Sequence, residues 1–240
     1  MRNSEIDSAR CCTLYHKTHH IMEEKKIIIN GHEAVDLGLS VMWATCNIGA
    51  NNPKDLGVKY HWGEIEPPTE KSRFYDEEKG FVDYTIIGLH YLQGYKRWRY
   101  KENGKTRSII NDISGSDMYD VARHKWGAKW RMPRVAEVDE LIDECTWEPM
   151  KIGELCVCKI TEKNGNSIFL PTDEEFYGHF YTSQYQIDTS DDEYGCDGEC
   201  YLSCHSGCSY VNITGGQGAA MPIRPVIGNE DRIPISQNKK

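Results

Sequence analysis

The segment ARHKWGAKWRMPRVAEVDEL, residues 122 to 141, joins two helical patterns through a glycine and a pair of tryptophans. The first pattern follows Ser116, which can cap a helix whose first turn contains Asp117. Gly127 tolerates the positive φ that commonly ends a helix, so we expect this helix to end there. The expected helical stripe consists of Met118, Val121, Ala122, Lys125 and Trp126.

The second pattern begins at Pro133, because a missing N–H costs nothing in the first turn of a helix. Apolar residues then recur at helical spacing and should form one buried stripe. That stripe consists of Val135, Val138, Leu141, Ile142 and Cys145. The acidic residues between them, which include Glu137, are expected to face water and not to form an acid–base pair.

Strand patterns flank the two helical patterns. A β-branched run ends at Asn30-Gly31, a pair typical of a two-residue hairpin turn, and Asn103-Gly104 predicts another hairpin within YKRWRYKENGKTRSII. After the helices, residues 156–160 and 167–171 have strand-like alternation or a short apolar run. These patterns indicate an α+β chain with a flexible leader at 1–26, one domain at 27–228 and a frayed tail at 229–240.

The composition argues against two classes of partner. A net charge of −9 over 240 residues disfavours a nucleic-acid partner, since such binders need a positive surface. We expect no membrane span, because no apolar run approaches the roughly 20 residues that one needs. The first 26 residues contain no apolar stretch of the secretory kind, so a cytoplasmic location is expected by default. The oligomeric state stays open.

Four cysteines recur at every fourth position in CDGECYLSCHSGCSYVNI, at 196, 200, 204 and 208. A metal site is one interpretation of this spacing. A hairpin that turns at Ser206-Gly207 fits the residue types better, because it sets Cys204 opposite Ser209 and Leu202 opposite Val211 on one apolar face. We therefore expect Cys200 and Cys204 in the core, while Cys196 and Cys208 stay ambiguous.

The preceding stretch DTSDDEYGCDGE is acidic. Asp188, Asp192 and Glu199 are weak candidates for calcium ligands, yet Glu193 stands where a calcium-binding EF-hand loop needs glycine. Another calcium arrangement stays possible beside a solvated acidic loop. No other cofactor is expected.

Several separated blocks resemble the Fibrobacter succinogenes major paralogous domain of gut Bacteroidetes. They include VDLGLSVMWATCNIGA (35–50), YHWGE (60–64), YDVARHKWGAKWRMPRVAEVDELIDECTW (119–147), NGNSIFLP (164–171), YTSQY (181–185) and IRPV (223–226). The resemblance covers about residues 34–227. It implies a C-type-lectin-like fold related to the formylglycine-generating enzymes, with two helices packed on small twisted antiparallel sheets and with long loops.

The resemblance also implies a tryptophan-rich core. Trp126 and Trp130, with Met132, should bury the junction between the helices. Trp43, Trp62 and Trp147 are expected in the core as well. The chain departs from the family at Arg134, where threonine is usual, so the capping box is lost and Glu137 should lack its partner. It also departs at Thr182–Gln184, where Trp-Ser-Ser is usual, and in lacking the usual export signal.

We expect a non-enzymatic recognition domain that binds a protein or carbohydrate ligand through its C-terminal half. In some relatives of this fold that half is diversified by retroelements. The expected face is rich in tyrosine and short polar groups, which adapt to a partner at low entropic cost. It consists of Tyr181, Tyr185, Asp188, Asp191, Asp192, Tyr194, Tyr201, His205, Tyr210 and Asn212. The calcium-dependent sugar triplets of animal lectins are absent.

The alternative is a copper-dependent oxidase related to the formylglycine-generating enzymes. That chemistry uses a copper-binding cysteine pair in the C-terminal half, and the cysteines from 196 to 208 are the candidates.

Overall fold

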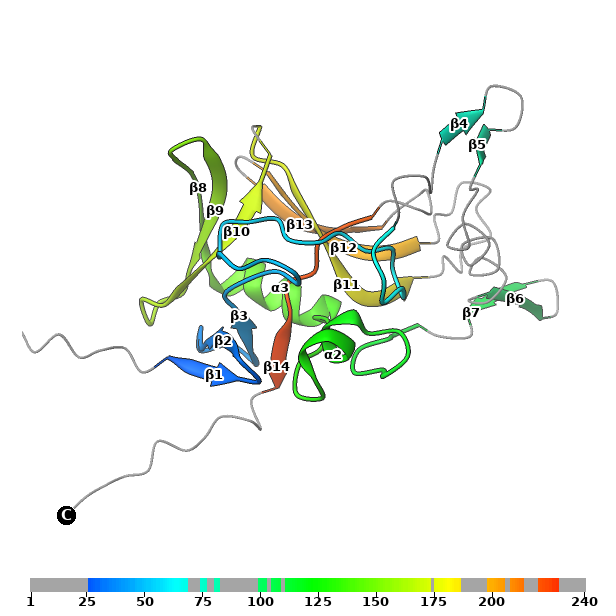
Figure 1. The fold of residues 1–240 in the computed structure, drawn as a ribbon, viewed down its shortest axis with the longest axis horizontal. Helices are drawn as coiled ribbons and strands as arrows, with labels where there is room; N and C mark the ends of the chain where they lie inside the picture. Colours follow the sequence, from blue (N-terminus) through cyan, green and yellow to red (C-terminus); the bar gives the residue numbers. More distant parts are fainter. Residues whose placement is uncertain are drawn as a thin grey trace, which may run out of the picture.

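The described part of the chain folds into small antiparallel sheets around two helices (Figure 1). The computed structural model describes residues 26–68, 74–76, 80–82, 99–102, 105–108, 111–173, 175–186, 198–205, 208–213 and 220–228. Both helices lie between two groups of strands in the chain, so the class is α+β, as predicted. No helix in these ranges is long and apolar enough to cross a lipid bilayer.

The first sheet brings the two ends of the described chain together. Its strands are β1 (Ile27–Ile29), β2 (His32–Val35), β3 (Val41–Ala44) and β14 (Val226–Gly228), in the order β1-β2-β3-β14. Asn30 and Gly31 both have positive φ, 51° and 83°, as a type I′ hairpin turn requires. The predicted hairpin is therefore confirmed. At the other edge of this sheet β14 pairs with β3, as Figure 1 shows.

Helix α2 (Val121–Trp126) is shorter than predicted because a different residue caps it. The cap is Asp120, whose Oδ1 accepts from the backbone N–H groups of Ala122 and Arg123. Its Oδ2 accepts from Gly115 N at 2.7 Å and from Met132 N at 2.9 Å. The prediction of Ser116 as the cap is wrong, since residues 117–119 form a turn before the helix.

Helix α3 (Val135–Glu144) begins two residues later than predicted. Pro133 therefore precedes the helix, and Arg134 is its N-cap. Glu137 accepts a hydrogen bond from Arg134 N at 2.8 Å and pairs with the guanidinium of Arg131 through both carboxylate oxygens. The expectations that Glu137 faces water and lacks a partner are both wrong. The Glu137 half of the capping box is therefore kept, because the N-cap backbone N–H still donates to it, and Arg131 adds an ion pair.

Two further sheets follow the helices. One has the order β10-β9-β8 and consists of β8 (Thr146–Ile152), β9 (Leu155–Thr161) and β10 (Ser167–Thr172). Pro149 and Pro171 lie in its two edge strands, where a missing N–H is tolerated. The other has the order β11-β12-β13 and consists of β11 (Gly178–Gln186), β12 (Gly198–His205) and β13 (Cys208–Ile213).

Two further hairpins precede α2 in the described part of the chain. One pairs β4 (Phe74–Asp76) with β5 (Gly80–Val82). The other pairs β6 (Arg99–Glu102) with β7 (Lys105–Ser108) and confirms the hairpin predicted around Asn103-Gly104.

Strand β3 separates two apolar clusters, which explains why all four of its residues are buried. Met42 and Ala44 face the first cluster, with Trp62, Trp126 and Trp130. Val41 and Trp43 face the second, which also contains residues of α3 and of the later sheets. Trp147 is only partly buried, at the margin of the second cluster, so it is a weaker part of the core than expected.

His32 lies flat on Trp126, with ring centroids 3.7 Å apart and an interplanar angle of 9°. Burial lowers the pKa of His32 below its ordinary 6.5. As pH falls through 6.5, the unfolded chain takes up this proton before the folded protein does, so stability falls.

We therefore expect the melting temperature to drop between pH 7.5 and pH 5.5, and to drop less in His32→Phe. Calorimetry of both proteins at the two pH values measures the difference. Equal drops would contradict the role given to His32.

Candidate functional site

The β11-β12-β13 sheet has one side in the core. Residues of α3, including Val138 and Leu141, share the second cluster with Phe180, Leu202 and Cys204 of this sheet. Alternation along β12 then turns Tyr201 and His205 to the opposite side, where both are half-buried. The sheet therefore has one side covered by a helix and one side that is partly open.

The register of β12 and β13 is the one predicted from the cysteine spacing. Cys200 is opposite Ile213, Leu202 is opposite Val211 and Cys204 is opposite Ser209. Cys200 and Cys204 are buried, at 3% and 1% exposure. Because side chains alternate along the strand β12, these two thiols both face the core. The described cysteines of the 196–208 segment do not lie along one helix, and they do not form a metal-binding group.

Rings gather on the open side, in two contacting groups. Tyr177 and His205 have centroids 5.4 Å apart, and His205 and Tyr210 are 5.9 Å apart. His179 and Tyr201 form a second pair at 5.1 Å. Tyr177 and Tyr210 remain 46% and 43% exposed, and His179 and Asn212 are exposed as well. We define the aromatic–histidine face as Tyr177, His179, Tyr201, His205, Tyr210 and Asn212.

Two predicted members of the face are buried, and their assignment to it is wrong. Tyr181 is 1% exposed and Tyr185 is 4% exposed. Tyr181 lies opposite Tyr201 on β12, but this end of the sheet is covered by the first cluster, in which Trp62 and Met221 take part.

The contacts that cover these tyrosines come from distant segments. Trp62 packs on Tyr185 with ring centroids 5.7 Å apart, and Tyr181 N donates to Pro222 O at 3.2 Å. The open face therefore ends at Tyr201, which is partly exposed and packs against the first cluster, and it extends from there to the β12–β13 connection.

The remaining predicted members divide into two groups. Tyr201, His205, Tyr210 and Asn212 lie together on the face. The others, Asp188, Asp191, Asp192 and Tyr194, lie outside the described residues.

Sequence reasoning missed Tyr177 and His179. His179 is opposite Ser203, which is opposite Tyr210, so the three residues cross the sheet in one row. The alternation of β12 could have been extended to residues 178–186 to find His179. Tyr177 precedes β11, where alternation carries no information.

The pKa shifts of His179 and Tyr201 favour a ligand that is bound through neutral groups of the aromatic–histidine face. Loss of hydration lowers the pKa of His179, Lys59 lowers it further, and Asp173 opposes both. Burial raises the pKa of Tyr201 above its ordinary range. At neutral pH these two side chains therefore present a neutral imidazole and a phenol hydroxyl.

The candidate metal ligands do not form a site in the described part of the chain. Glu199 is 8% exposed and pairs with Tyr185 across the strands, while Asp188 and Asp192 lie outside the described residues. No group of three or more His, Cys, Asp or Glu side chains there could hold an ion.

The thiols of β12 are held in the protonated form. Burial raises the pKa of Cys200 to about 11 and that of Cys204 to about 12. At neutral pH both thiols are therefore protonated, and they pack as apolar core side chains.

Cys208 differs from the buried cysteines and gives a prediction. It is exposed, and its Sγ lies 2.7 Å from Nε2 of His205. Among the seven cysteines described, we expect iodoacetamide to alkylate Cys208 first in the folded protein, while Cys200 and Cys204 react only on unfolding. Peptide mass spectrometry over a time course measures the order. Native labelling of Cys204 as fast as that of Cys208 would contradict the buried placement.

Comparison of the chain with protein-family models, with curated proteins and with solved structures found no match.

Proposed function

We propose that this protein is a non-enzymatic recognition domain that binds a protein or glycan ligand through the aromatic–histidine face. The observation that carries the proposal is the exposure of Tyr177 and Tyr210 on either side of His205. Tyrosine combines an apolar ring with a polar hydroxyl and is enriched at interfaces, so two exposed tyrosines that contact one histidine ring on the same sheet favour a binding surface.

The arrangement suits binding for three physical reasons. Tyrosine provides contact area and a hydroxyl while only two side-chain torsions need to be fixed. His205 and Tyr210 lie on paired strands, so their positions are held before a ligand arrives. Asn212 and His179 add neutral donors and acceptors around the rings, which can select orientation without a charged partner.

The proposal includes a C-type-lectin-like arrangement of the α+β fold. The two described helices, the small antiparallel sheets and the burial of Trp43, Trp62 and Trp130 support it. The burial of Cys200 and Cys204 supports recognition over the copper-dependent oxidase, because that chemistry needs a cysteine pair open to copper and substrate.

The test is binding to a glycan array and a protein array, each with and without calcium. We expect wild type to select a ligand. The double variant Tyr177→Ala, Tyr210→Ala should bind that ligand at least about tenfold more weakly, because truncation of central interface residues removes much of the binding energy.

Met118→Ala, Leu155→Ala is the matched control, since it removes two exposed apolar side chains elsewhere, 63% and 47% exposed. Its binding should equal that of wild type. Equal binding by both double variants would contradict the proposed face.

A further inference from the structure

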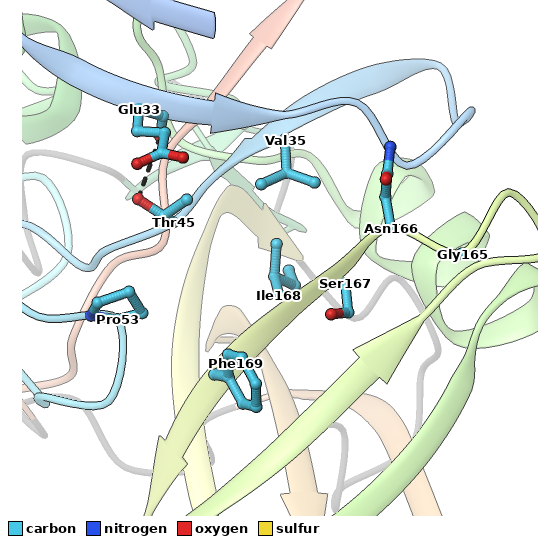
Figure 2. Close-up of a pocket in the computed structure, with 9 residues that line it drawn as sticks. All are labelled: Glu33, Val35, Thr45, Pro53, Gly165, Asn166, Ser167, Ile168 and Phe169. Carbon is cyan, nitrogen blue, oxygen red and sulfur yellow. Dashed lines mark hydrogen bonds between the residues drawn. The ribbon is translucent and has the colours of Figure 1, made fainter. Parts of the chain in front are cut away.

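A hollow separate from the aromatic–histidine face lies between β2 and β3 on one side and β10 on the other (Figure 2). Its volume is about 240 Å³. The walls include the carboxylate of Glu33, the hydroxyl groups of Thr45 and Ser167, and the ring of Phe169. The lining therefore combines one acid, two hydroxyls and one aromatic surface.

The lining from β10 is continuous, because Ser167, Ile168 and Phe169 all border the hollow. In β2, Ala34 is buried while Glu33 and Val35 on either side of it are only partly so. In β10, Leu170 is buried, and Ser167 and Phe169 alternate with the buried Ile168. Figure 2 shows Glu33 and Thr45 at one wall and Phe169 at another.

The backbones of the two walls are joined by one buried side chain. Arg224 donates from Nη1 to Thr45 O at 2.7 Å and from Nη2 to Phe169 O at 2.8 Å. Because a single guanidinium holds both carbonyl groups, the walls keep a fixed separation, and a ligand need not organise them.

Glu33 and the Phe169 ring each already contact the ammonium group of a lysine of the same chain. Lys26 Nζ lies 3.0 Å from Glu33 Oε2, and Lys54 Nζ lies 5.9 Å from the centroid of the Phe169 ring. Lys26 is 69% exposed, whereas the Glu33 side chain is 29% exposed. Lys26 thus reaches the acid from solvent, and an external ammonium group can take its place.

The hydroxyl of Thr45 has capacity for a further bond. Its two contacts are long, 3.4 Å to Glu33 O and 3.7 Å to Cys46 Sγ. An oxygen at this position can accept a hydrogen bond from an ammonium group, which carries three donors.

We propose that this pocket binds a primary ammonium group at the end of a short alkyl chain. Glu33 is its counter-ion, Phe169 supplies the cation–π surface, and the hydroxyls of Thr45 and Ser167 accept the remaining hydrogen bonds. Lys26 and Lys54 are internal competitors. The site does not depend on the proposed function of the aromatic–histidine face.

The test is a titration of the full chain, followed by NMR amide shifts, with three probes. Nα-acetyl-lysine amide carries a side-chain ammonium and glycinamide a terminal one, while Nα-acetyl-norleucine amide has the apolar chain without charge. We expect saturable shifts at Thr45 and Phe169 with an ammonium probe and none with norleucine. The tighter of the two ammonium probes identifies the source.

Variants separate binding from incidental contact. Glu33→Gln should weaken binding at least about tenfold, as loss of a charge-assisted contact does, while the exposed Glu154→Gln on the β8–β9 turn should leave it unchanged. Lys54→Met should strengthen binding severalfold, because it removes a competitor. Equal shifts with the norleucine probe, or wild-type affinity in Glu33→Gln, would overturn the proposal.

Discussion

Replacing Arg224 with methionine should lower the free energy of unfolding by about 3 kcal/mol or more. Arg224 is 1% exposed, and burial lowers its pKa to about 9, so the guanidinium stays charged at neutral pH. It donates to Asn47 Oδ1 at 2.7 Å and to the carbonyls of Ala44, Thr45 and Phe169 at 3.1, 2.7 and 2.8 Å. Methionine fills much of the space but leaves these acceptors without donors, at roughly 1–3 kcal/mol each for a buried group.

Urea unfolding of wild type and variant measures this loss. Arg224→Lys should also destabilise, because one ammonium group cannot reproduce the planar fork that reaches two walls. Arg123→Met is the control, since its ion pair with the 86% exposed Asp117 should contribute less than about 1 kcal/mol. A loss in Arg224→Met no larger than that of the control would show that the buried guanidinium does not hold the strands together.

Replacing Trp130 with alanine should cost about 3–5 kcal/mol, the range for a fully buried large aromatic. Trp130 is 0% exposed. Its Nε1 donates to Ile29 O at 3.0 Å, and its ring meets Trp126 edge-on with centroids 5.0 Å apart. The change removes the contact that fastens the turn after α2 to the first sheet.

Trp147→Ala is the matched control, because it deletes the same side chain from a partly buried position. Thermal unfolding of the two variants should show a clearly larger loss for Trp130→Ala. Equal losses would contradict the central place given to the tryptophan that follows α2.

The sequence was most informative where local rules decide the structure. The turn at Asn30-Gly31 and the pairing of β12 with β13 follow from backbone preference and from a period of two, and both were predicted correctly. The start of α2 was not, because Asp120 also accepts from the backbone of Met132, twelve residues away. Local rules could not choose between Ser116 and Asp120, since serine and aspartate are both favoured at the N-cap, and the distant contact to Met132 favours Asp120.

The candidate site shows the same limit. Alternation identified which side of β12 would be open, but not which end of that side other segments would cover. Tyr181 and Tyr185 are buried because Trp62, about 120 residues earlier, packs over them. Glu137 was misplaced for a similar reason, since its partner Arg131 lies outside the helix that contains Glu137.

The most direct test of the recognition face is the alkylation rate of Cys208 in wild type with and without the ligand that the arrays select. Cys208 Sγ lies 2.7 Å from His205 Nε2, so a ligand seated on Tyr177, His205 and Tyr210 must also cover this thiol. We predict that saturating ligand slows alkylation of Cys208 at least about fivefold and leaves the rate of the partly buried Cys46 unchanged. An unchanged rate at Cys208 under saturating ligand would place the binding surface elsewhere on the protein.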